Sequence, residues 1–287
     1  MDHRTDRWFR GRVGEESMEP DVRSWPRYSR AVFVALATIM AATVALWGGN
    51  GEAKSVHRSP STKAASSKSP VRLAAVTDHL PIDPDDFVTQ IDNPLFPLKP
   101  GTVFHYRGSD EVGTKAETMT VTERTKEILG VTTTVIKDVS RLNGKLYERT
   151  YDWYAQDVDG NVWYLGEDAS YFEEGEIVSK EGSWEAGVDG AKAGILINAD
   201  PRVTDSYRQE FLPGEAEGMF WVVGVGESKT VPYGEFSDAV HTLEWSPTEP
   251  RIVGEKYYGP GVGLLEERAL SGGVDVVKLI KVDQPVD

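Results

Sequence analysis

Hydrophobic and polar residues alternate along most of the chain beyond residue 100. Met119 and Val121, for example, alternate with threonines, and β-branched residues dominate positions 131–139. A period of two is typical of β-strands with one buried face. Strands are predicted at residues 102–107, 117–124, 131–139, 145–156, 161–166, 219–225, 229–231, 239–245, 252–258, 263–269 and 274–282. Because no helical period of about twelve residues or more interrupts them, the pattern indicates an antiparallel meander.

Glycine-containing turns separate these segments, such as Asn143-Gly144, Pro260-Gly261 and the hairpin turn at residues 157–160. A sheet of so many strands curls, closes or splits into two layers. We therefore expect a mainly β fold with one large curved antiparallel sheet or an incomplete barrel, of the lipocalin or lipoprotein-carrier type. A β-sandwich is the alternative. Short helices are expected near residues 83–89 and 187–196, and the loop at residues 182–198 is expected to lie over the concave face.

Residues 31–47 are an unbroken hydrophobic run with threonine as its only polar residue type. As a helix the run spans about 25 Å, slightly less than the ~30 Å hydrocarbon core of a membrane. Several arginines, the last of them Arg30, stand just before the run, whereas the first basic residue after it is Lys54. This asymmetry predicts that the N-terminus is cytoplasmic and that the chain after the run is extracytoplasmic. Two outcomes remain open: cleavage after a small residue such as Ala53, or a retained anchor, which the long preceding arm and Trp47 favour.

Composition divides the chain into four expected regions. These are a cytoplasmic basic arm (residues 1–30), a transmembrane signal-anchor or signal peptide (31–47), a disordered tether rich in Ser, Gly and Pro (48–75), and an extracytoplasmic β domain (76–287). The net charge of −15 is uneven, because residues 1–75 hold 12 Lys/Arg and 7 Asp/Glu whereas the β domain holds 19 and 39. Such an acidic domain repels phosphate backbones, which excludes nucleic acid as a partner. Membrane contact depends on an uncleaved segment 31–47, and the oligomeric state stays open.

Aromatic side chains gather on two neighbouring strands and on one glycine-rich loop. Period-two geometry puts Tyr151 and Trp153 on one face of the longest predicted strand, and Trp163 follows just beyond the next turn. Trp184 stands beside Glu185 in the loop, as in a ligand lid. The predicted ligand-binding residues are therefore Tyr151, Trp153, Trp163, Trp184 and Glu185. The structural alternative is that the aromatic pairs only hold the sheet together and that Trp184 only pins the loop.

Carboxylates are too plentiful to identify a catalytic pair. Glycoside hydrolysis needs two of them at a defined separation, and the sequence does not show which ones face each other. The candidates are Glu148, Asp152, Glu167, Glu185, Asp189, Glu210 and Glu244. Asp157, Asp159 and Asn161 have the spacing of calcium ligands, but Val162 occupies the position where an EF-hand loop needs glycine, so a hairpin turn is favoured.

The sequence contains no motif that is typical of metal or cofactor binding. The chain has no cysteine, which excludes disulfides, thiolate zinc sites and cysteine nucleophiles. Three histidines beyond the tether, His79, His105 and His241, are not at metal-binding spacing. No phosphate-binding loop, dinucleotide fingerprint or nucleophile elbow is present. We therefore predict no metal and no cofactor.

Several longer motifs carry a resemblance to a family. They are DNPLFPLKPGT (residues 92–102), YDWYAQD (151–157), GNVWY (160–164), EGSWEAGVDGA (181–191) and YYGPGVGL (257–264). With these motifs the chain resembles an uncharacterised family of secreted or membrane-anchored bacterial proteins with a curved antiparallel β-sheet domain. The match covers residues 85–280. It implies secretion and the fold class, and it brings no catalytic residues.

Three functions are consistent with these observations. The first is an extracytoplasmic ligand-binding module of the cell envelope, for a small amphiphile or a sugar-containing ligand. The second is a hydrolase or lyase that acts on an extracellular or cell-wall polymer through paired carboxylates. The third is a structural scaffold protein of the envelope, which a large exposed apolar patch and a filled interior would favour.

Overall fold

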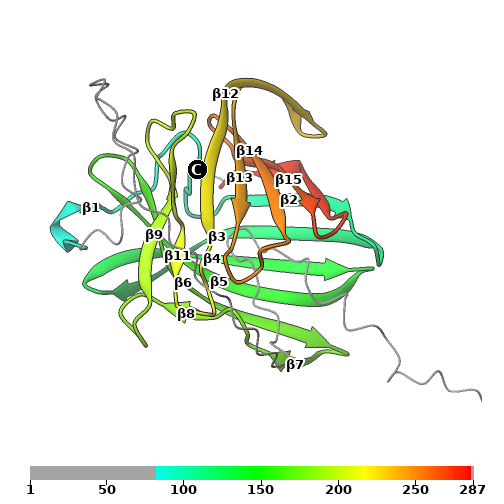
Figure 1. The fold of residues 1–287 in the computed structure, drawn as a ribbon, viewed down its shortest axis with the longest axis horizontal. Helices are drawn as coiled ribbons and strands as arrows, with labels where there is room; N and C mark the ends of the chain where they lie inside the picture. Colours follow the sequence, from blue (N-terminus) through cyan, green and yellow to red (C-terminus); the bar gives the residue numbers. More distant parts are fainter. Residues whose placement is uncertain (1–81, 286–287) are drawn as a thin grey trace, which may run out of the picture.

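Period-two alternation becomes strand over most of the chain that the structure describes. The computed structural model describes residues 82–285. The strands form one sheet in which every recorded pairing is antiparallel (Figure 1). Its central path runs β10 (Ser206–Arg208), β12 (Met219–Val231), β13 (Gly234–Trp245), β14 (Val253–Gly259), β15 (Gly263–Ser271), β16 (Val276–Asp283), β2 (Val103–Ser109), β3 (Thr114–Ile128), β4 (Val131–Leu142), β5 (Lys145–Asp157), β6 (Val162–Glu173), β9 (Lys192–Ile197) and β11 (Glu210–Phe211). Off this path, β1 (Phe87–Val88) pairs with β5, while β7 (Glu176–Ser179) and β8 (Trp184–Glu185) pair with β6.

The sheet nearly closes into a barrel, because the two ends of its path are adjacent in sequence. β10 and β11 lie at opposite ends of the strand order, and only Gln209 separates them. The chain therefore passes from one sheet edge to the other within one residue, a junction that we call the seam. Gly194 of β9 lies so close to it that an added Cβ would stand 2.4 Å from the carbonyl oxygen of Arg208. In Figure 1, β3 to β6 run across the view and β12 to β15 run up it.

The segment at residues 91–102, which we call the plug, crosses one end of the barrel. Gln156 of β5 accepts hydrogen bonds from the backbone N–H of Asp92 and of Asn93. The Gly261 N–H donates to Pro94, and the Gly101 N–H donates to Val121. Buried apolar side chains of the plug, Ile91, Leu95, Phe96 and Leu98, belong to the hydrophobic core. The plug thus ties together strands from both halves of the sheet.

The predicted curved sheet or incomplete barrel is confirmed, and the strands do not separate into the two layers of the alternative β-sandwich. The helix expected at residues 187–196 is wrong. Gly187 and Gly190 adopt positive φ of 87° and 85° in tight turns, and the chain then enters β9, where Ile195 pairs with Trp163. The loop at residues 182–198, expected to lie over the concave face, instead contributes two strands to the sheet, because β8 and β9 both pair with β6.

The helix expected near residues 83–89 is one 3₁₀ turn, Pro84–Asp86, capped by the side chain of Asp83. Within residues 82–285 no helix is both long and apolar enough to cross a membrane. The predicted membrane segment 31–47 and the tether 48–75 lie outside the described residues.

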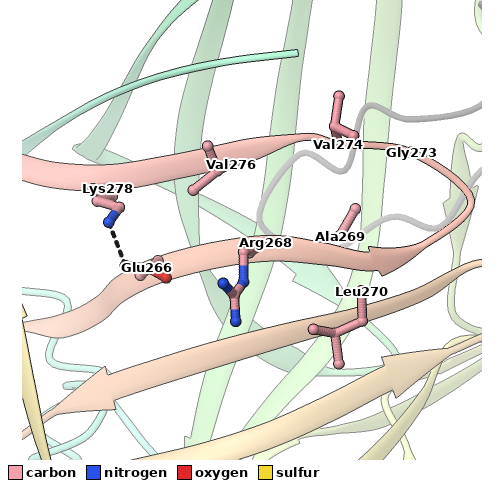
Figure 2. A pocket seen from close by; sticks show the side chains of 8 residues that line it. All are labelled: Glu266, Arg268, Ala269, Leu270, Gly273, Val274, Val276 and Lys278. Atoms are coloured by element: carbon pink, nitrogen blue, oxygen red, sulfur yellow. Dashed lines mark ion pairs between the residues drawn. The ribbon is translucent and has the colours of Figure 1, made fainter. Parts of the chain in front are cut away.

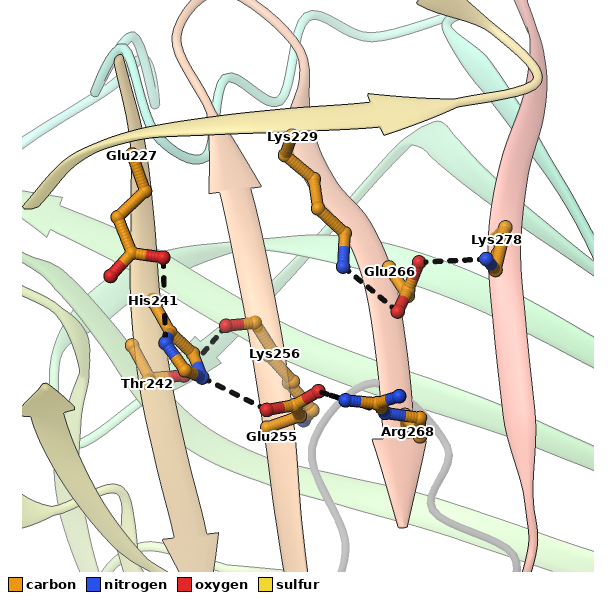
Figure 3. Close-up of polar contacts among 9 residues, drawn as sticks. All are labelled: Glu227, Lys229, His241, Thr242, Glu255, Lys256, Glu266, Arg268 and Lys278. Carbon is orange, nitrogen blue, oxygen red and sulfur yellow. Dashed lines mark hydrogen bonds and ion pairs between the residues drawn. The ribbon is translucent and has the colours of Figure 1, made fainter. Parts of the chain in front are cut away.

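Residues 219–231, predicted as two strands, form a single bent strand, β12. Its register against β13 shifts three times between Val222 and Lys229, and Gly226 has a φ of +68° within this stretch. Such irregularities bend a strand and increase its twist. The far half of β12 consequently leans over β14 and β15 (Figure 3), which brings Lys229 close to residues of β15.

We expect Gly166 of β6 to be the most substitution-sensitive glycine at the β6–β8 contact. Its φ is +141°, and a Cβ there would stand 2.4 Å from the Trp184 carbonyl oxygen and 2.9 Å from the Trp153 ring. Gly166→Ala should therefore cost about 2–3 kcal/mol more than Gly175→Ala. Gly175 also has positive φ but nothing within 4 Å, so it is the matched control. Urea denaturation of the full-length variants measures the difference, and equal stabilities contradict the prediction.

Candidate functional site

Strand alternation directs one side of β5 into the barrel, and that side carries polar residues. Glu148, Thr150, Asp152 and Tyr154 occupy alternate positions and are all nearly fully buried. Asp152 lies opposite Ile136 on β4 and Glu167 on β6. Since cross-strand partners point to the same side, these carboxyl groups share the interior. The opposite side of β5 carries Tyr147, Arg149, Tyr151 and Trp153.

Tyrosines from opposite sides of the barrel fill much of its interior. Tyr154 stacks on Tyr164 with ring centroids 4.8 Å apart, and Phe96 of the plug meets Tyr154 edge-on at 5.4 Å. Tyr106 and Tyr258, on β2 and β14, are also 1 % exposed. Burial raises the pKa of all four tyrosines well above the ordinary value. The interior is therefore a packed layer of rings and carboxyl groups.

Lys256 of β14 supplies positive charge within this interior. Its Nζ lies 2.7 Å from a carboxylate oxygen of Glu244 and 3.7 Å from one of Glu267. Burial alone lowers the pKa of Lys256, but these two carboxylates outweigh burial and raise it. Nζ of Lys115, at the start of β3, is 2.5 Å from a carboxylate oxygen of Asp275. Carboxyl groups nevertheless outnumber ammonium groups on the inner face within residues 82–285.

Burial gives several of these acids unusual proton affinity. It raises the pKa of Glu148 to about 8, although Tyr171 and Thr150 both donate hydrogen bonds to this carboxyl group. Burial likewise raises the pKa of Asp152 to about 7, against a hydrogen bond from Tyr164, and that of Glu267 to about 8, against the charge of Lys256. Perturbed acids of this kind concentrate at functional sites.

Another buried acid, Glu210, stands at the seam. One of its oxygens accepts from the Gly218 N–H at 3.2 Å, and the other accepts from the Trp184 indole N–H at 3.1 Å. Burial raises the pKa of Glu210 to about 8 in spite of both bonds. Trp184 also meets the ring of Tyr164 edge-on at 5.2 Å. The glycine-rich segment is thus fixed to the barrel interior by Trp184.

The structure brings together only some of the ligand-binding residues predicted from the sequence. Lys126 lies between two of them, with its Nζ 3.4 Å from the Trp153 ring centroid and 2.7 Å from Glu185. Tyr151, on the same face of β5, lies under the guanidinium of Arg124. These three residues are on the outer face, whereas Trp184 points inward.

Trp163 is also on the outer face, where it stabilises the β5–β6 turn. Its indole N–H donates to Asp157 at 2.8 Å, and Asp157 also accepts from the backbone and side chain of Asn161. The ring meets Phe87 edge-on. The favoured prediction of a hairpin turn at residues 157–160 is therefore confirmed. Within residues 82–285 no group of three or more His, Asp or Glu side chains is arranged to hold a metal ion.

Two separate groups of polar contacts lie on the outer face between β12 and β16 (Figure 3). Nε2 of His241 is 3.0 Å from Glu255, which also accepts from Arg268, and Nδ1 of His241 is 3.6 Å from Glu227. Separately, Glu266 lies 2.9 Å from Lys229 and 3.1 Å from Lys278. Burial favours the protonated form of Glu266, but hydrogen bonds from both lysines outweigh it and lower its pKa.

An open pocket of about 520 Å³ lies beside these ion pairs on the β15–β16 hairpin (Figure 2). Its charged lining residues are Arg268, Lys278 and Glu266, and Glu266 is paired with Lys278 at 3.1 Å. Its apolar lining includes Ala269, Leu270, Val274 and Val276. Leu270 is 48 % exposed and Val274 63 %. The pocket thus combines two basic groups and one carboxylate with exposed apolar side chains.

Sequence reasoning missed the inner residues Glu117, Asp138 and Lys256. A signal was present in the phase of the alternation, because Glu117 shares its side of β3 with Met119 and Val121. A charged residue in the phase of buried hydrophobic residues marks an inward-facing polar group. That rule selects Glu117 directly.

Comparisons with known proteins assign no family. No family model matches the sequence, and no curated protein matches it. Among solved structures, the chain is similar to a protein from Parabacteroides distasonis that is provisionally described as a lipoprotein. The identity is 13 %, the TM-score is 0.32, and the match covers 67 % of this chain and 99 % of that one.

A second solved structure, from Bacteroides fragilis, is provisionally described as an exported protein with a YmcC-like fold. It is 14 % identical with a TM-score of 0.36, and the match covers 66 % of this chain and 98 % of that one. Neither likeness is strong enough to support an inference about this chain.

We expect removal of the Lys256 charge to destabilise the barrel strongly. Lys256→Met leaves Glu244 and Glu267 buried without their shared cation, which costs about 3–5 kcal/mol. The double variant Lys256→Met/Glu244→Gln should recover part of this loss, whereas Lys281→Met, at an exposed ion pair, should change little. Urea titrations of the full-length proteins at pH 7 measure each value. An unaffected Lys256→Met variant contradicts the prediction.

Proposed function

We propose that this protein is an extracytoplasmic ligand-binding module whose ligand is a small amphiphile with an acidic head group. The observation that carries the proposal is the open pocket on β15 and β16, where Arg268 and Lys278 adjoin exposed apolar side chains. Support for an extracytoplasmic site comes from the hydrophobic segment 31–47 and the arginines before it.

The apolar part of such a ligand has a suitable surface in this pocket. Val274 and Leu270 are among the more exposed hydrophobic residues of the described chain. Covering apolar area gains roughly 25 cal/mol per Å². An alkyl or isoprenoid segment that lies against these two side chains therefore gains affinity without a change in the strands.

Arg268 provides the anchor for an acidic head group. Its Nε and Nη2 both donate to one oxygen of Glu255, while its side chain is 50 % exposed. A guanidinium carries five N–H donors, so donors remain for a carboxylate or phosphate. Lys278, 43 % exposed, adds a second positive charge and pairs with only one oxygen of Glu266, at 3.1 Å. On a strongly acidic domain these two residues supply a local site for an anion.

The hydrolase hypothesis has less support in the geometry. Glu117 and Asp138 are carboxyl groups in direct contact, but they are 3 % and 1 % exposed. A polymer chain cannot reach them in this conformation. The hydrolase and scaffold functions stay hypotheses.

Probe binding tests the proposal. Dansylated undecanoic acid should bind the full-length protein in detergent-free buffer, and Val274→Asp should weaken binding about tenfold or more, because it places a like charge at the pocket and removes apolar contact. Val158→Asp is the matched control, since both valines are 63 % exposed and Val158 lies in the β5–β6 turn. Fluorescence titration measures both affinities. Equal weakening by the two substitutions, or no binding by the wild type, overturns the proposal.

A further inference from the structure

Two acids of the barrel interior, Glu117 on β3 and Asp138 on β4, lie close enough to form a hydrogen bond when one of them is protonated. They are diagonal neighbours on the inner face, since Glu117 pairs with Ser140 and Asp138 pairs with Met119. A carboxylate has only acceptors, so two carboxyl groups form a hydrogen bond only when one of them carries a proton. Like charges at this separation, away from water, also oppose double ionisation.

No other described residue forms a hydrogen bond with the carboxyl group of Asp138. Within residues 82–285, neither of its oxygens receives a hydrogen bond from an N–H group or a hydroxyl. Next to it on the inner face, one oxygen of Glu148 and the hydroxyl of Tyr154 are likewise buried without a hydrogen-bond partner in that range. Tyr154 is 1 % exposed, and its hydroxyl is electrostatically coupled to Asp138 and Asp152. The centre of the barrel thus has unmet hydrogen-bonding capacity made mostly of acceptors.

Local positive charge offsets the burial of these two acids only in part, because the pKa of Glu117 stays raised. Glu117 interacts with Lys115 and Lys256, but each lysine is already held at close range by another carboxylate, Asp275 or Glu244. Burying an ionised carboxylate without a partner is far more costly than protonating it. Protons are consequently the cations that balance the interior.

We propose that the interior of the barrel is a proton-binding site, in which Glu117 and Asp138 share one proton and Glu148 holds another, and that loss of these protons loosens the barrel. This inference is independent of the ligand pocket on β15 and β16.

Every strand around the site contributes groups that influence these protons. Facing them are Tyr106 on β2, Lys115 on β3, Asp152 and Tyr154 on β5, Tyr171 on β6, Lys256 on β14, Glu267 on β15 and Asp275 before β16. Apart from the two lysines, all of these are acids or phenols. The surrounding field therefore favours retention of the protons, and burial raises the pKa of Glu117, Asp138 and Glu148.

The direction of the pH effect follows from linkage. Each raised acid binds a proton in the folded barrel but has lost it in the unfolded chain above about pH 4. Its contribution is complete in acid, declines as pH rises above the unfolded pKa, and is lost at the folded pKa, which is about 8 for Glu148. For Glu148, whose folded pKa is about 8, a rise from pH 5.5 to 7.5 should lower the folding equilibrium constant about 100-fold.

Two isosteric variants test the site in the full-length chain. In Asp138→Asn the new amide donates to Glu117 as the shared proton does, and in Glu148→Gln the amide replaces the acceptor that has no partner. Glu148→Gln should reduce the fall of the folding constant between pH 5.5 and 7.5 by about 100-fold relative to wild type, and Asp138→Asn should reduce the fall in the same direction. Asp159→Asn, at an exposed position in the β5–β6 turn, should leave the fall unchanged. Urea titrations at each pH supply the constants.

Infrared spectroscopy provides a readout that does not depend on stability. The folded wild type at pH 6.5 should show the carbonyl stretch of protonated, buried carboxylic acids, and Asp138→Asn or Glu148→Gln should diminish it. A folding constant that is flat from pH 5.5 to 7.5, the same pH dependence in both variants as in wild type, or absence of the acid band in the wild type overturns the proposal.

Discussion

Closure of a polar-faced sheet on itself is the constraint on which the rest of this structure depends. In a nearly closed barrel, every second residue of each long strand loses contact with water whether it is apolar or not. Here the inward positions of β3, β4 and β5 include Glu117, Asp138, Glu148 and Asp152. The packing of the tyrosines, the position of Lys256 and the state of the carboxyl groups all follow from the need to accommodate these acids.

The sequence was sufficient to predict the fold class but not the inner face. Alternation identified β5 and the turn after it, because the period of two is local and Asp157 satisfies that turn with its own side chain. Alternation alone does not say which phase points inward. On β5 the aromatic phase with Trp153 looked like the ligand side, whereas the phase with Asp152 and Tyr154 is the interior.

Contacts between distant residues explain most of the remaining differences. Residues 187–196 contain glycines and alanines that suit several structures, and β9 forms only because β6 offers Trp163 and Tyr164 as partners. β10 and β11 are two or three residues long, so no periodicity reveals them. The contact of Lys229 with Glu266 depends on the bend of β12, which arises from register shifts against β13.

Within residues 82–285, the pairing of β2 with β16 joins the first strand of more than two residues to the last strand. The edges of β2 and β15 therefore stay unpaired until β16 has been synthesised and has paired with both strands. The plug also depends on residues that come much later in the sequence, since it precedes β2 but is hydrogen-bonded to Gln156 and Gly261. Contacts of such long sequence separation form slowly, so the plug is synthesised before most of the barrel but is among the last segments to settle. A chain shortened at its C-terminus loses the β2–β16 pairing and exposes the backbone of β2 for pairing with other chains.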